Sequence, residues 1–218
     1  MKNDELKVYL EEIIGQAKMA ISATTSLNEL TALRNKIIDC QDVSVRRRMI
    51  SESPNLGYDT FRNLHSFLTH VSNISRLIWP PIISSNKKCY CDKQSAKGGV
   101  CGACVGRARS ANILKALEIG DADHIIKTRT IRDHLEHFDE RLDNWVQTSK
   151  HRNYIQDFVG PKDAIRGVDQ GDRMRHYDPE TADLIFRGES YSIIELFDGL
   201  DDIISRTMTA LAKLDLRN

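Results

Sequence analysis

Residues 121–148 read DADHIIKTRTIRDHLEHFDERLDNWVQT, and this stretch decides the predicted fold. Apolar side chains recur in it at steps of four, three, four and three residues, which places them on one helix face: Ile131, Leu135, Phe138, Leu142 and Trp145. Asp121 or Asp123 can accept hydrogen bonds from the free N–H groups of a first helical turn. The sequence therefore predicts one long helix over 121–148.

Arg132, Asp133 and His137 lie on the polar side of this predicted helix, with four residues between the arginine and the histidine. On these residues and on the phrase RDHLEHFDERLDNW, the chain resembles the HEPN superfamily (higher eukaryotes and prokaryotes nucleotide-binding). The resemblance implies an all-α, HEPN-like helical bundle. It also implies a metal-independent endoribonuclease of a bacterial toxin or phage-defence type, with tRNA or mRNA as substrate and an antitoxin or sensor protein as partner.

The resemblance further implies catalytic roles for Arg132, His137 and Asp133, with two copies of the motif facing each other in a homodimer. An imidazole titrates near neutral pH and can act as base or acid, and a guanidinium binds phosphate oxygens. Asp133 lies four residues before His137, so its carboxylate can orient the imidazole. RNA cleavage would leave 2′,3′-cyclic phosphates. Arg129 and His134 form an overlapping match, so the choice between the two pairs stays open.

Four cysteines cluster between residues 85 and 109, as a C-x-C pair followed nine residues later by a C-x2-C pair: Cys89, Cys91, Cys101 and Cys104. Two close pairs flanking a short glycine-containing loop suit one tetrahedral zinc ion. Disulfides, an iron–sulfur cluster or unmodified thiols are the alternatives. We expect structural Zn²⁺, since four thiolates leave no open position for water. The segment carries six cations and one aspartate, so it is also a candidate contact for nucleic acid.

Length and composition favour a single domain, 1–218, with the cysteine segment 85–109 as an insertion. The chain has 31 basic and 31 acidic residues, so its net charge indicates no particular partner. No apolar run has the length of a membrane span, and the N-terminus lacks an apolar signal core. We therefore expect a cytoplasmic protein without membrane contact.

Helical periodicity also predicts helices over residues 4–22, 26–41, 59–78, 111–119 and 193–213. Ser110 is the predicted cap of the fourth helix. Residues 149–180 read as irregular, and residues 182–194 as a short β-hairpin that turns at 187–189. The spacing of the acidic residues within 149–180 does not match a calcium loop.

The competing function is a non-catalytic helical dimer that binds nucleic acid or a protein partner. In that case Arg132 and His137 would form ion pairs instead of acting on a substrate. A zinc hydrolase is disfavoured, because catalytic zinc needs an open coordination position.

Overall fold

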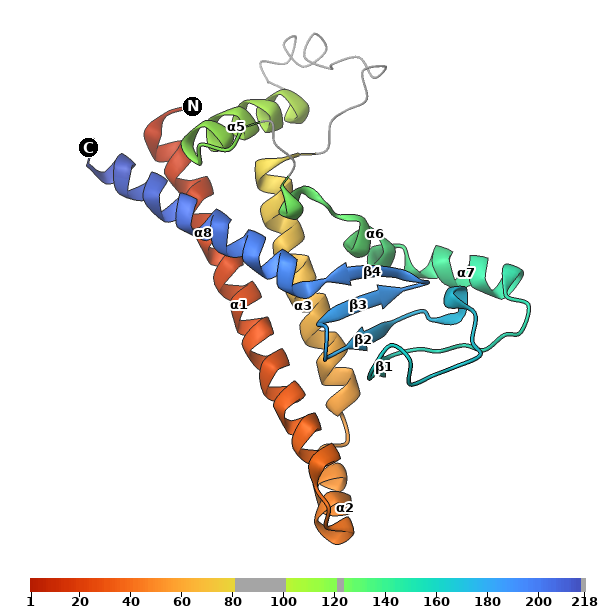
Figure 1. Cartoon of the computed structure of the whole chain (residues 1–218). Coiled ribbons are helices and arrows are strands. Elements are labelled where there is room, and N and C mark those ends of the chain that lie inside the picture. Colours follow the sequence, from red (N-terminus) through yellow and green to blue (C-terminus); the bar gives the residue numbers. More distant parts are fainter. Residues whose placement is uncertain (81–100, 121–123, 217–218) are drawn as a thin grey trace. The chain divides into compact units, whose positions relative to one another are not determined.

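The computed structural model describes residues 1–80, 101–120 and 124–216 (Figure 1). The described chain is mostly helical, with a small four-stranded sheet near the C-terminus. It divides into two compact units: unit 1 contains residues 1–18, 70–129 and 198–218, and unit 2 contains residues 19–69 and 130–197. Among the described helices, none combines the length and the apolar character that crossing a membrane requires.

The helices are α1 (Asn3–Asp39), α2 (Val43–Glu52), α3 (Leu56–Ile78), α5 (Gly102–Ala116), α6 (Thr130–Glu136), α7 (Phe138–Thr148) and α8 (Ile193–Asp215). The structure confirms the predicted helices over 59–78 and 193–213. The prediction of separate helices over 4–22 and 26–41 is wrong, because α1 continues through both. The hydroxyls of Thr24 and Thr25 donate to the Ile21 carbonyl at 2.9 and 3.0 Å, so they are satisfied without ending the helix.

The prediction of one long helix over 121–148 is also wrong. Residues 121–123 lie outside the described residues, and the rest forms a 3₁₀ turn (Ile125–Lys127) followed by α6 and α7. The two helices are separated at His137, whose φ and ψ are −101° and 37°. No proline or glycine marks this break. His134 and Phe138 on either side of it both contact the ring of Phe186, so packing against the sheet is the physical reason we assign.

The sheet contains β1 (Phe158–Val159), β2 (His176–Asp178), β3 (Asp183–Phe186) and β4 (Glu189–Ser192), in that order. The predicted hairpin is confirmed as β3 and β4. Its turn residues Arg187 and Gly188 have positive φ values of 49° and 91°, which suit a two-residue type I′ turn. Residues 149–180 are not all irregular as predicted, since β1 and β2 lie there and pair in parallel.

Buried polar groups fasten the loops around this sheet. Asp172 accepts hydrogen bonds from the Trp145 indole and the Ser149 hydroxyl, both at 2.7 Å. Arg173 donates to the carbonyls of Lys162 and Ile165, and His176 donates to the carbonyl of Gly160. These side chains therefore serve the fold of the loop, because each buried polar group needs a partner.

Each unit has its own apolar core. In unit 1 the fully buried side chains come from α1, α3, α5, the 3₁₀ turn and α8: Leu10, Ile13, Ile74, Ile78, Ile113, Ile126, Leu200 and Ile203. In unit 2 they include residues of α1, α3, β3 and the segment before β2: Ala20, Leu64, Phe67, Met174, Leu184, Ile185 and Phe186. The hydrophobic effect of burying these side chains stabilises the elements that carry the polar sites.

Helix α5 starts earlier than the sequence predicts. It begins at Gly102 instead of residue 111, with Cys101 as its N-cap residue. Ser110 is therefore inside the helix, and its hydroxyl donates to the Ile78 carbonyl at 2.6 Å instead of capping a helix. A side chain from α5 thus satisfies a carbonyl at the C-terminal end of α3, where helical carbonyls lack partners within the helix.

Candidate functional site

Arg132 and His137 interact with different glutamates. The Arg132 guanidinium pairs with the Glu136 carboxylate one turn along α6, and its side chain is 13% exposed. The Nδ1 atom of His137 lies 3.3 Å from Glu140 Oε1, and this imidazole is 56% exposed. Asp133 contacts His137 through its backbone carbonyl, which accepts from the His137 N–H at 3.0 Å. The described contacts therefore do not join Arg132, Asp133 and His137 into one site within a single chain.

Arg132 instead shares a small cavity with another histidine. A cavity of about 140 Å³ is lined by His65 and Thr69 of α3 and by Arg132 and Glu136 of α6, among others. His65 Nε2 and Arg132 Nε are both buried without a hydrogen-bond partner in the described part of the chain. Burial lowers the pKa of His65, and the positive charge of Arg175 lowers it further. Arg132 is thus the cation of this cavity, beside a histidine that favours its neutral form.

Of the histidines within residues 121–148, His134 is the one whose ring contacts several polar and aromatic side chains. Its ring stacks on Phe186, with the ring centroids 5.1 Å apart and the planes 15° apart. Arg141 Nε donates to His134 Nδ1 at 3.2 Å, and His134 Nε2 lies 3.3 Å from Glu189 Oε2. A guanidinium can only donate, so the proton of the neutral imidazole is assigned to Nε2, which donates to Glu189.

Tyr191 completes this cluster. Its hydroxyl donates to the same oxygen of Glu189, Oε2, that faces His134. This hydrogen bond, with a smaller contribution from His134, holds the pKa of Glu189 below its usual range, against the opposing effect of desolvation. Burial raises the pKa of Tyr191, and the neighbouring carboxylate raises it further. Glu189 is therefore ionised and Tyr191 protonated at neutral pH.

The β3–β4 hairpin positions Glu189 and Tyr191. Phe186 pairs with Glu189 across the turn, and Leu184 pairs with Tyr191. Because side chains two positions apart on a strand share a face, Glu189 and Tyr191 lie side by side above Phe186 and meet His134 there. We name His134, Arg141, Glu189 and Tyr191 the His134 cluster. The predicted hairpin turn and the alternation of β4 were the sequence signals that could have located its second half.

The cysteines are only partly within the described chain, since Cys89 and Cys91 lie outside it. Cys101 is 5% exposed at the start of α5, and Cys104 follows in the first turn, with its N–H donating to the Cys101 carbonyl at 3.0 Å. This one-turn spacing suits two thiolates on one metal ion. The described residues contain no group of three or more metal-ligating side chains. Zinc therefore stays a prediction from the sequence.

We expect the purified chain to hold about one zinc ion, because two cysteine pairs provide four thiolates. Cys101→Ser and Cys104→Ser should each lose most of the metal, and thermal stability should fall with it, since binding a structural ion adds to folding free energy. Elemental analysis and thermal denaturation test this. Cys40→Ser is the control, as Cys40 contacts the Asp42 carbonyl and is outside the cluster. Zinc-free protein with two disulfides would contradict the prediction.

Comparisons with known proteins provide no relative for this site: no family model matches the chain, and neither a curated protein nor a solved structure matches it significantly. The functional argument therefore rests on the chemistry of the residues themselves.

Proposed function

We propose that the protein is an endoribonuclease that cleaves RNA without a metal ion, and that the His134 cluster is its reaction centre. The observation that carries the proposal is the position of one imidazole between an ionised carboxylate and a guanidinium. Phosphodiester cleavage needs a base, an acid and a cation for the charge that builds on phosphate. The cluster contains one group of each kind.

The reaction follows from the chemistry of these groups. Glu189 accepts the proton of the ribose 2′-hydroxyl, whose oxygen attacks phosphorus as the bond to the 5′-oxygen breaks. Both hydrogen bonds from His134 and Tyr191 go to Oε2, so Oε1 is the oxygen that accepts this proton. Arg141 moves from His134 Nδ1 to the phosphate and stabilises its charge. Nδ1 can then bind a second proton, and the resulting imidazolium donates this proton to the departing 5′-oxygen. The products are a 2′,3′-cyclic phosphate and a 5′-hydroxyl.

The exposure of the groups is consistent with these roles. The side chains of His134, Arg141 and Glu189 are 18%, 34% and 61% exposed, so a strand in solvent can reach all three. The His137 imidazole is more exposed than that of His134, and the contact described for it is with Glu140. We therefore assign the working histidine to His134, which belongs to the overlapping Arg129/His134 match, in preference to His137.

The biological role is inferred from the HEPN resemblance alone. We infer a toxin or phage-defence nuclease that forms a homodimer and is controlled by an antitoxin or sensor protein. In such a dimer, Arg132 of each subunit could contribute a further phosphate contact, provided that it exchanges Glu136 for the substrate.

Cleavage of a single-stranded RNA by wild type and variants, with and without EDTA, tests the proposal. We expect His134→Ala and Glu189→Gln each to lower the rate by about 10²- to 10⁴-fold, the usual contribution of a positioned acid or base. Added imidazole should restore part of the activity of His134→Ala, and products should end in cyclic phosphate. His137→Ala is the matched control and should keep its activity.

The opposite pattern of variant activities would assign the reaction centre to other residues. Loss of activity in His137→Ala and Arg132→Ala, with His134→Ala unaffected, would support the pair implied by the HEPN resemblance. Equal degradation by all variants would indicate a contaminating nuclease and contradict the proposal.

A second candidate function is a non-catalytic binding protein, favoured by the ion pair between Arg132 and Glu136. A phosphate ligand would have to compete with this carboxylate. RNA binding without cleavage, equally strong in wild type and Glu189→Gln, would select this candidate.

A further inference from the structure

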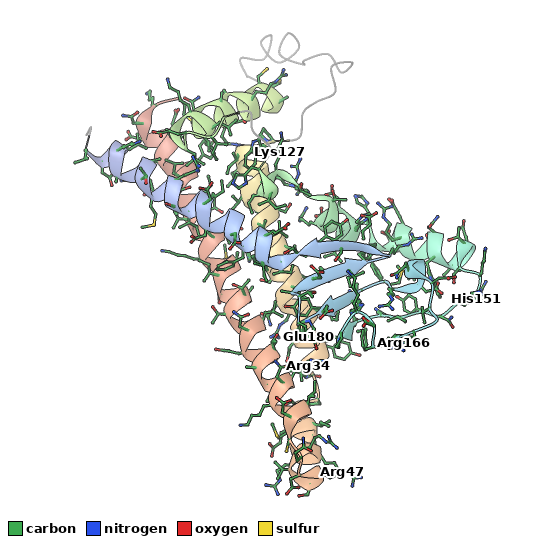
Figure 2. All side chains as sticks on the ribbon, in the orientation of Figure 1. Arg34, Arg47, Lys127, His151, Arg166 and Glu180 are labelled. Atoms are coloured by element: carbon green, nitrogen blue, oxygen red, sulfur yellow. The ribbon has the colours of Figure 1, made fainter. Side chains whose placement is uncertain are left out.

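Unit 1 contains a cavity of about 690 Å³, which lies within the usual size range of small-molecule sites. Its described lining comes from the two residues that follow α3, from one side of α5, and from residues 127 and 129. Figure 2 labels Lys127 beside the C-terminal end of α3. We call this space the α5 cavity. It is distinct from the His134 cluster, whose residues all belong to unit 2.

The charged side chains among the described lining residues of the α5 cavity are all positive. Arg107, Arg109, Lys127 and Arg129 contribute to its wall, and no carboxylate is among the described lining residues. The chain as a whole has equal numbers of acidic and basic residues. Four cations around one concave space raise the local concentration of an anion.

Two of the cations are held in place without being neutralised. Arg109 Nε donates to the Leu77 carbonyl at 3.1 Å, and its NH2 group donates to the Arg76 carbonyl at 3.0 Å. Arg129 NH1 donates to the Trp79 carbonyl at 3.4 Å. These carbonyls carry no net charge, and a guanidinium has five N–H donors, so each arginine has donors left for a ligand. Fixed donors bind at a lower entropic cost than mobile ones.

Stabilising the end of α3 accounts for the contacts of Arg109 and Ser110 with its last carbonyls. It does not account for Arg107, an exposed residue that lines the same cavity.

The cavity also has an aromatic wall. Trp79 lines it, with Pro80 and Leu114 as further apolar neighbours. The indole contacts the His124 ring, with the centroids 5.6 Å apart and the planes tilted by 31°, and His124 in turn contacts Asp202. An anchored indole can stack on a flat ring, and such stacking is tolerant of the identity of the base.

We propose that the α5 cavity binds a nucleoside triphosphate, with its phosphates on the cations of α5 and residues 127–129 and its base against Trp79. A compact polyanion suits cations that surround one cavity, whereas a nucleic-acid strand requires a groove that follows its backbone. This proposal does not depend on RNA cleavage at the His134 cluster.

Isothermal titration of the full-length protein, as purified, with ATP tests the site. We expect ATP to bind and the variant Arg107→Ala/Lys127→Ala to bind it about 10- to 100-fold more weakly, because hydrogen bonds to charged groups are lost. Arg47→Ala is the matched control. Arg47 is an exposed arginine of α2 in unit 2, and the variant should bind ATP as the wild type does (Figure 2).

Inorganic tripolyphosphate, which has no base, tests the phosphate contacts separately from the contact of the base with Trp79. Trp79→Leu should weaken ATP binding and leave tripolyphosphate binding unchanged, provided that circular dichroism confirms its fold. Any of three results would overturn the proposal: no ATP binding at millimolar concentration, ATP binding unchanged in Arg107→Ala/Lys127→Ala, or tripolyphosphate binding as tightly as ATP. An RNA oligonucleotide that binds more tightly than ATP and depends on Arg107 and Lys127 would also overturn it, by assigning the cavity to a strand.

Discussion

Replacing Arg175 with methionine should lower the free energy of unfolding of unit 2 by about 3–5 kcal/mol, the cost of removing one partner of a buried ion pair. Arg175 Nε lies 2.8 Å from Asp157 Oδ1, and its NH2 group donates to Oδ2 at 2.9 Å. The two side chains are only 17% and 18% exposed. The variant therefore leaves Asp157 charged and largely desolvated without its partner.

Aromatic packing adds to the expected loss. The Arg175 guanidinium lies over the Phe138 ring, 4.8 Å from its centroid, and 5.9 Å from that of Phe61. One cation therefore links the sheet region to α3 and α7. Cation–π contacts of this kind contribute about 0.5–2 kcal/mol. Methionine keeps some of the apolar contact with both rings, so the ion pair should dominate the measured effect.

Urea denaturation, followed by the fluorescence of a tryptophan in unit 2, measures the loss in unfolding free energy. Trp79 belongs to unit 1 and Trp145 to unit 2, so Trp79→Phe leaves Trp145 to report on unit 2. In that background, Arg175→Met/Asp157→Leu is the matched control. It removes both charges and should be more stable than Arg175→Met alone. A loss under about 1 kcal/mol for Arg175→Met would contradict the prediction, because exposed ion pairs contribute that little.

Gly199→Ala should destabilise unit 1 by about 1–3 kcal/mol, the usual effect of overpacking. Gly199 lies inside α8, where alanine normally stabilises a helix by about 1 kcal/mol. Here a Cβ atom would collide with the Ile125 side chain and approach Ile126 Cγ1 to 3.2 Å. Ile126 is fully buried, so the segment has little room to move away.

Gly15→Ala is the matched control for this prediction. Gly15 is also inside a helix of unit 1, but a Cβ atom there would meet nothing within 4 Å. It should therefore stabilise the chain by about 0.5–1 kcal/mol. Urea denaturation followed by Trp79 fluorescence in a Trp145→Phe background compares the two variants. If both variants changed the free energy of unfolding in the same direction, the close approach between α8 and residues 124–126 would not explain the effect of Gly199→Ala.

For the proposed reaction centre, the sequence indicated the stretch that carries His134 but not the contacts that His134 makes. It drew attention to the arginines and histidines of residues 129–137, and to the turn at Arg187-Gly188. It gave no indication that His134 meets Glu189, 55 positions away, or that Arg132 shares a cavity with His65. Side-chain spacing along one helix describes neighbours on that helix, whereas these partners depend on how the sheet and α3 pack against it.

The elements that the sequence determined by itself are those whose signals are local. The apolar periodicity of α3 and α8 and the glycine of the β3–β4 turn act through neighbouring residues, so they could be read directly. Only the tertiary structure decided the separation of α6 from α7, the parallel pairing of β1 with β2, and the meeting of four cations around the α5 cavity. In these cases packing and hydrogen bonds between distant segments outweigh the weak local preferences of the backbone.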